Sequence, residues 1–179
     1  MKKVSGFTLI ELMVTIALAA VLLTVGIPGV QEFIQNNNRT AAVNDLIASL
    51  QQTRSEAIKR NQTTVLCPST DNATCSGGDW EDGWIGFVDE DENWTPDNAA
   101  AIFLVDAGPS GPTVGAAHTM LQYKANGRAE TNAGNDQAEF IICDSRGLDE
   151  SRMVLIFRSG RTQASDTDLD NATPTSCTP

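Results

Sequence analysis

The sequence predicts an α+β protein in which one long N-terminal helix packs on a compact antiparallel β head. An apolar run extends from Phe7 to Ile27, and a helical pattern then continues to about Arg60. After Asn61, short β-type runs alternate with turn residues. With 179 residues, of which 41% are hydrophobic and 20% charged, the chain suffices for a single core of modest size.

The chain begins with a short basic leader, Lys2 and Lys3, that ends at Gly6 and directly precedes the apolar run. A secretory signal places its apolar stretch before the cleavage site, so the reversed order here predicts that the hydrophobic segment survives processing. As a helix, Phe7 to Ile27 would span about 31 Å, enough to cross a bilayer. Because the lysines hold the leader in the cytoplasm, we expect a single-pass inner-membrane protein with a periplasmic or extracellular bulk.

Glu11 is the carboxylate inside this apolar run. A charge at membrane depth costs roughly 2.5–3.5 kcal/mol, so its presence requires a partner and indicates a purpose beyond anchoring. The alternative is a signal anchor whose glutamate extends toward the membrane interface.

Gly26, Pro28 and Gly29 interrupt the helical pattern, and a kink or a local melt is expected there. The alternative is a membrane helix that ends near Ile27. Apolar residues then recur at helical spacing, at Val43, Leu46, Ile47, Leu50, Ala57 and Ile58. The opposite face is expected to be solvated, and it comprises Arg39, Asp45, Gln51, Gln52, Arg54, Glu56 and Lys59.

The head is predicted to contain short strands joined by turns. We expect strands at residues 63–67, 84–88, 101–105, 120–123, 140–143 and 153–157, with a last hairpin at Ser159-Gly160 that returns through residues 161–164. Residues 106–117, which are rich in glycine and proline, are expected to form a loop or strand connection. The tail after Ser165 is polar and acidic.

The four cysteines form an even set in an exported domain, where disulfides are the default. Of the three possible connectivities we favour Cys67 with Cys75, which closes a small loop, and Cys143 with Cys177, which attaches the tail to a central strand. A metal site is disfavoured because there is no Cys-x-x-Cys spacing and His118 is the single histidine.

Other site chemistry has weak support. The acidic run 89–93 matches the first ligand positions of an EF-hand, but Trp94 replaces the glycine and Ala100 the bidentate glutamate, so a solvated loop is the better interpretation. A hydrolase triad would have to use His118, and no Gly-x-Ser-x-Gly elbow lies nearby. We therefore expect no catalytic residues and no cofactor, and a non-enzymatic protein.

The string Gly6-Phe7-Thr8-Leu9-Ile10-Glu11 resembles the N-terminus of the type IV pilin-like superfamily. The resemblance implies that a prepilin peptidase cleaves between Gly6 and Phe7 and methylates the new amino terminus of Phe7. Glu11 would then be the fifth residue of the mature chain. In low dielectric, its carboxylate would pair with the Phe7 amine of a neighbouring subunit and set the register between apolar helices.

The head carries further motifs, and with them the chain resembles the GspH/FimT family of minor pilins and minor pseudopilins, within it the FimT/FimU type. They are Cys67-Pro68-Ser69, the run 80–89, Cys143-Asp144-Ser145-Arg146-Gly147 and Ser159-Gly160-Arg161. The resemblance implies a leader at 1–6, a transmembrane or filament-core helix at 7–27, its amphipathic continuation at 28–60, and a periplasmic β-rich head at 61–179.

As function, the resemblance implies a low-abundance type IV pilus subunit that primes assembly at the filament tip and supports twitching motility and adhesion. Its partners would be other minor pilins and the major pilin, through the N-terminal helix, together with the prepilin peptidase and a large tip adhesin. The alternative within the fold is a GspH-like minor pseudopilin of type II secretion.

An alternative from another class is a DNA-binding minor pilin for DNA uptake. Some FimT-like pilins bind DNA through a Gly-Arg-x-Arg element, and here Gln163 replaces its second arginine. Arg158 and Arg161 are the candidate phosphate contacts. Because the net charge is −11 and phosphate neutralisation needs several cations, DNA is the less favoured partner.

Overall fold

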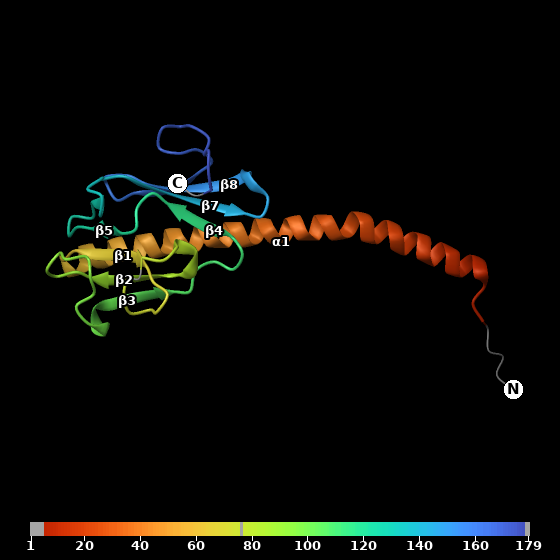
Figure 1. Cartoon of the computed structure of the whole chain (residues 1–179), viewed down its shortest axis with the longest axis horizontal. Coiled ribbons are helices and arrows are strands. Elements are labelled where there is room, and N and C mark those ends of the chain that lie inside the picture. Colours follow the sequence, from red (N-terminus) through yellow and green to blue (C-terminus); the bar gives the residue numbers. More distant parts are fainter. Residues whose placement is uncertain (1–5, 76, 178–179) are drawn as a thin grey trace. The chain divides into compact units, whose positions relative to one another are not determined.

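The computed structural model describes residues 6–75 and 77–177, so the leader lysines Lys2 and Lys3 lie outside the described part. It confirms the α+β class, with one long helix packed on antiparallel sheets (Figure 1). The chain divides into two compact units, residues 1–37 and residues 38–179, and we call the second the head unit.

Helix α1 (Leu9–Arg60) runs without interruption from the apolar segment to the predicted end. Pro28 lies inside it, so the predicted local melt is wrong, and so is the alternative that the helix ends near Ile27. The proline removes one backbone donor. The residues on both sides keep their own helical bonds, and the loss of one bond does not end the helix.

The head unit contains two antiparallel sheets. The first has the order β3-β2-β1-β5-β6 and comprises β1 (Thr64–Pro68), β2 (Trp84–Val88), β3 (Ile102–Asp106), β5 (Leu121–Tyr123) and β6 (Ala129–Thr131). The second has the order β4-β7-β8-β9 and comprises β4 (Thr113–Ala116), β7 (Ala138–Asp144), β8 (Gly147–Ile156) and β9 (Thr162–Ser165). All strand pairs are antiparallel. Short 3-10 helices, η1 (Trp80–Asp82) and η2 (Ala99–Ala101), precede β2 and β3.

Two of these strands were not predicted. β4 lies in the stretch 106–117, which was expected to be a loop or strand connection. Pro112 and Gly115 are turn-forming residues, so the sequence does not show a strand that pairs with β7. β6 has only three residues, too few for an alternating pattern to be visible. Both are defined by their partner strands rather than by their own sequence.

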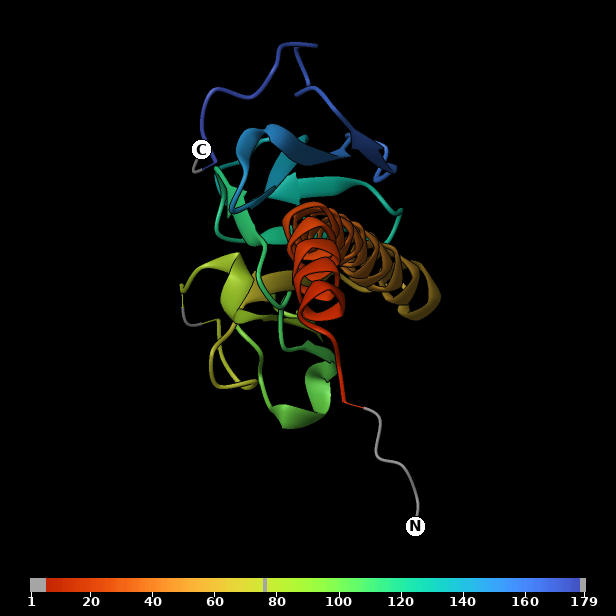
Figure 2. The same ribbon diagram turned by 90° about the vertical axis from the view of Figure 1, so that its right-hand side faces the viewer.

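The core lies where the second half of α1 passes between the two sheets, as the end-on view shows (Figure 2). The helix contributes Leu46 and Leu50, which are fully buried together with Trp84 from the first sheet and Phe140 from the second. The predicted apolar stripe is therefore largely confirmed. Ile58 departs from it, because it is 50% exposed near the end of the helix, beyond the core.

Both sheets also have an apolar outer face. On the first sheet it comprises Val65, Cys67, Ile85 and Phe87, and on the second Ile141, Cys143, Met153 and Leu155. The structure contains the disulfides Cys67–Cys75 and Cys143–Cys177, the pairing that the sequence favoured. Each disulfide attaches an irregular segment to one of these faces, because Cys75 packs on the first and Cys177 on the second.

Candidate functional site

The N-terminal unit presents an apolar helix surface with a single carboxylate near its start. Phe7 is 83% exposed and Glu11 is also exposed. Helix α1 is long and apolar enough to cross a membrane, and its apolar window is not buried in the structure. Side chains of this kind require lipid or neighbouring apolar helices in place of water.

Glu11 has a defined place at the helix start. The hydroxyl of Thr8 accepts a hydrogen bond from the backbone nitrogen of Glu11 at 3.3 Å. Thr8 thus caps the helix and Glu11 is its third residue, the Thr-x-x-Glu order of a capping box. The positive end of the helix dipole favours a carboxylate there. This local order fixes Glu11, which the sequence assigned to assembly, in the first turn of the helix, four residues after the exposed Phe7, which it assigned to processing.

Arg39 contradicts the prediction of a solvated face. Its guanidinium is 6% exposed and lies 3.7 Å from Asp144 and 3.1 Å from Glu150, and it also donates to the backbone carbonyl of Glu150. Asp144 in turn binds Arg146, and this hydrogen bond lowers the pKa of the Asp144 carboxyl. The Cys-Asp-Ser-Arg-Gly motif therefore forms the β7–β8 hairpin and pairs it with the helix. The sequence prediction missed this contact because it assigned the charged side chain of Arg39 to solvent from its residue type alone.

Arg54, on the same predicted face, joins the two sheets. Its Nε donates to the carbonyl of Gly127 at 3.0 Å, and its Nη2 donates to the carbonyl of Ser159 at 2.7 Å. These carbonyls belong to the β5–β6 turn and the β8–β9 turn. Gly160 has φ +75°, and a Cβ there would lie 2.0 Å from the Gly127 oxygen. The Ser-Gly-Arg motif is thus required for the close approach of two turns around one arginine.

The two candidate DNA contacts lie on the same β8–β9 turn but are not equally available. Arg158 pairs with Asp136 at 2.7 Å, and Arg128 lies 3.8 Å from the same carboxylate. Arg161 is exposed, with its guanidinium 4.6 Å from the centre of the Phe157 ring. Because Asp136 already pairs with Arg158, this turn does not present the several unpaired cations that are needed to neutralise a phosphate backbone.

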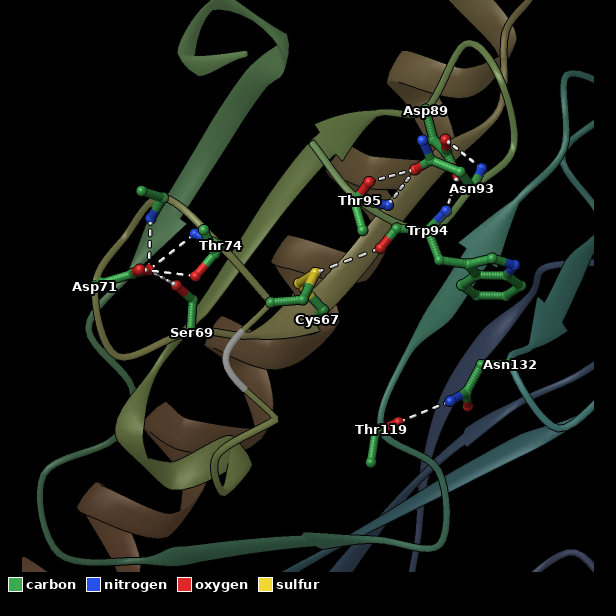
Figure 3. Close-up of a disulfide and its surroundings, with 12 residues drawn as sticks. Cys67, Ser69, Asp71, Thr74, Asp89, Asn93, Trp94, Thr95, Thr119 and Asn132 are labelled. Carbon is green, nitrogen blue, oxygen red and sulfur yellow. Dashed lines mark hydrogen bonds between the residues drawn. A yellow bond between two sulfur atoms is a disulfide. The ribbon is translucent and has the colours of Figure 1, made fainter. Parts of the chain in front are cut away.

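The acidic run 89–93 forms a closed loop rather than an open ligand cage (Figure 3). Asp89 is buried and accepts hydrogen bonds from the backbone nitrogens of Asn93 and Trp94, both at 3.0 Å, and burial raises the pKa of its carboxyl. Glu92 binds Thr63 at 2.9 Å and Lys124 at 3.0 Å. Across residues 6–75 and 77–177, no group of three or more His, Cys, Asp or Glu side chains is placed to hold a metal ion.

His118 lies in the core rather than in a site. Its ring packs edge-on against Phe140 with 4.9 Å between centroids, and its backbone carbonyl accepts the indole N–H of Trp80 at 3.2 Å. Burial lowers the pKa of His118 to about 4, so the ring is neutral near pH 7. Its Nε2 has no hydrogen-bond partner among the described residues. A neutral histidine among aromatic rings is a structural residue.

The comparisons with known proteins agree with this arrangement. The family model described as Type II transport protein GspH matches residues 42–160, and the model described as Prokaryotic N-terminal methylation motif matches residues 1–27. No curated protein matches the sequence.

Two solved structures share the fold, both of the type IV minor pilin FimU of Pseudomonas aeruginosa (strain PAO1). In space group P21, FimU is 24% identical, with a TM-score of 0.58, and the match covers 81% of this chain and 98% of that one. In space group P65 the identity is also 24%, the TM-score is 0.55, and the coverage is 77% and 98%.

Proposed function

Because the chain belongs to the GspH family, whose model matches residues 42–160, we propose that it is a minor pilin of a type IV pilus. In this role it is a low-abundance, non-enzymatic subunit that primes assembly at the filament tip and thereby supports twitching motility and adhesion. It resides in the inner membrane until a prepilin peptidase cleaves after Gly6 and methylates Phe7.

The observation that carries the proposal is the combination of a methylation motif with an apolar helix that has one carboxylate, Glu11, at its capped start. A plain membrane anchor has no use for that charge, which costs roughly 2.5–3.5 kcal/mol at membrane depth. The amine that cleavage creates on Phe7 of a neighbouring pilin is a matching cation. The pair favours one axial register among helices whose other contacts are apolar and non-directional.

A second candidate role is that of a minor pseudopilin in type II secretion. It is supported by the description of the matching family model, which names type II transport. Both roles use the same helix and the same processing, so they differ in the partner subunits rather than in the chemistry of this chain.

A deletion strain of the native host separates the two roles. The strain is complemented with the wild-type chain or with a Gly6→Val chain whose leader cannot be removed. The pilus role is supported if the deletion strain and the Gly6→Val strain lose twitching and surface filaments but still secrete, and the wild-type chain restores both properties. Loss of a secreted enzyme with intact pili supports the pseudopilin role instead, and loss of neither contradicts both.

Processing is tested on the same cells by the intact mass of the purified chain. We expect the mass to lack residues 1–6 and to carry one added methyl group at Phe7. In the Gly6→Val chain the leader remains, and the protein stays in the membrane fraction.

A further inference from the structure

The outer face of the β4-β7-β8-β9 sheet is apolar and lies under the C-terminal tail. Ile141, Cys143, Met153 and Leu155 on this face are at most 5% exposed, and Leu169 and Cys177 of the tail pack against them. Antiparallel sheets with one face on a core usually present a polar face to water. This face is therefore stable in water only while the tail covers it.

The covering segment, residues 166–177, which we call the strap, contacts the sheet through Leu169 and through polar groups near its start. The backbone nitrogen of Leu169 donates to Glu139 at 3.3 Å. Asp166 pairs with Arg152 at 2.9 Å, but the two side chains are 78% and 42% exposed, so water screens the pair and it holds the strap only weakly. After β9 ends at Ser165, the described strap contains no helix or strand.

The strap also does not pack closely on the sheet. A cavity of about 170 Å³ lies between them, with Ile141 and Met153 on the sheet side and Pro174 and Thr175 on the strap side. This pocket is open to solvent, and the strap and sheet atoms on its two sides do not touch, so they gain no dispersion energy there. The covalent bond between Cys143 and Cys177 is the strongest link that the structure gives the strap.

The other disulfide provides an internal contrast. Cys67 and Cys75 are 8 residues apart, whereas Cys143 and Cys177 are 34 apart. The short loop is also held by Asp71, whose carboxylate accepts from the backbone nitrogens of Ala73 and Thr74 at 2.9 and 2.8 Å (Figure 3). The strap contains a comparable turn, in which the Asp168 carboxylate accepts from the backbone nitrogens of Asp170 and Ala172 at 2.9 and 2.8 Å, but these bonds lie within the strap and do not attach it to the sheet.

We propose that the strap is a redox-latched cover: the Cys143–Cys177 disulfide holds it closed over the apolar sheet face, and reduction by a dithiol opens it. The inference rests on the proposed export of the head, because export brings the cysteines to an oxidising compartment. Reduction begins when a thiolate of the dithiol attacks Sγ of the half-buried Cys177. The Cys143–Cys177 bond breaks, and the buried Cys143 leaves as a thiolate that takes up a proton.

The second thiol of the dithiol then resolves the mixed disulfide and releases Cys177 as a thiol. Two electrons pass to the protein, and the dithiol becomes a disulfide. The freed strap then detaches, and the apolar face of Ile141, Met153 and Leu155 is exposed to solvent or to another apolar surface.

Met153 is a native reporter of the closed state, because it is 4% exposed beneath the strap and peroxide converts accessible methionine to the sulfoxide. The full chain in detergent micelles is compared with a Cys143→Ala/Cys177→Ala variant. The matched control is Cys67→Ala/Cys75→Ala. Peptide mass spectrometry follows sulfoxide formation at Met153 and at Met120, which packs on the outer face of the other sheet. Amide hydrogen exchange in β7 and β8 reports whether the sheet persists.

The proposal predicts that Met153 oxidises several-fold faster in the Cys143→Ala/Cys177→Ala variant, with Met120 and the β7 and β8 amides unchanged, and that the control oxidises Met153 at the wild-type rate. An unchanged Met153 rate would overturn it, because the strap would then dock without its latch. Equal gains at Met153, Met120 and the strand amides would also overturn it, because the disulfide would then hold the whole head together. These readouts use purified protein and do not depend on filament assembly.

Discussion

The guanidinium of Arg39 lies 3.7 Å from the carboxylate of Asp144, and each side chain is only 6% exposed. The pair joins the start of the head unit's helix to the β7–β8 hairpin, and Glu150 completes it at 3.1 Å. Replacement of Arg39 by alanine leaves the Asp144 charge buried without this partner. Because Arg146 still pairs with Asp144, we expect Arg39→Ala to lower the free energy of unfolding by about 1.5–3 kcal/mol in urea denaturation of the detergent-solubilised chain.

The control for this prediction is Arg158→Ala. Arg158 pairs with Asp136 at 2.7 Å, but its side chain is 63% exposed, so its removal should cost about 0–1 kcal/mol. Equal losses in the two variants would show that the Arg39 pair does not hold the hairpin to the helix.

Gly160 is required by the close approach of the two turns. Both Gly160 and Gly134 have a left-handed φ, +75° and +79°, but only Gly160 has atoms within 4 Å of a Cβ position. Gly134→Ala should therefore cost about 1–2 kcal/mol for backbone strain alone. Gly160→Ala should cost distinctly more, because its Cβ would displace the Gly127 carbonyl and Arg54. Thermal unfolding of both variants tests this, and an equal decrease in melting temperature would rule out the contact.

His118 should make stability depend on pH. Burial depresses its pKa from 6.5 to about 4, so the unfolded chain binds a proton at a higher pH than the folded chain. Stability from the neutral ring is present above about pH 6.5 and is lost as pH falls from there toward 4, by about 3 kcal/mol in total. Urea unfolding at several pH values tests it, with His118→Phe as the reference.

Comparison with that variant is needed because Asp89 acts in the opposite direction. Burial raises the pKa of its carboxyl, so its protonation favours the folded state as pH falls. The difference between wild type and His118→Phe removes this contribution. If the two chains lose stability in parallel between pH 6.5 and 4, the histidine is not the cause.

Calcium should not stabilise the acidic loop. The Asp89 carboxylate is already bound by the backbone nitrogens of Asn93 and Trp94, and Glu92 by Thr63 and Lys124. We expect no change in melting temperature on addition of millimolar calcium. A shift that Asp91→Asn abolishes would instead identify a site that forms only with the ion.

The sequence predicted those elements whose pattern is local. The helix end at Arg60 and the strand Trp84–Val88 followed from periodicity and alternation, and the structure has both at the expected bounds. The prediction of processing at Gly6 and Phe7 came from a contiguous string, and the N-terminal methylation model matches residues 1–27, which include it. Signals of this kind are contained in consecutive residues and need no knowledge of tertiary contacts.

The contacts that were missed depend on residues far apart in the chain. Arg39 was assigned to solvent because nothing near it in sequence shows that Asp144 and Glu150 return to it. Arg54 was assigned in the same way, although two turn carbonyls bind it. Strand β4 was not recognised because Pro112 precedes it and Gly115 lies inside it, and its pairing with β7 is what makes it a strand. Tertiary contacts thus override residue type and local propensity at these positions.

The central claim is that Glu11 directs assembly into a filament, and the most direct test is the amount of this chain in the sheared surface-filament fraction of a complemented deletion strain. Three chains are compared: wild type, Glu11→Val, and Glu32→Val, which removes the other carboxylate of the N-terminal unit. We predict wild-type incorporation for Glu32→Val and retention of Glu11→Val in the membrane fraction. Incorporation of Glu11→Val at the wild-type level would contradict the claim.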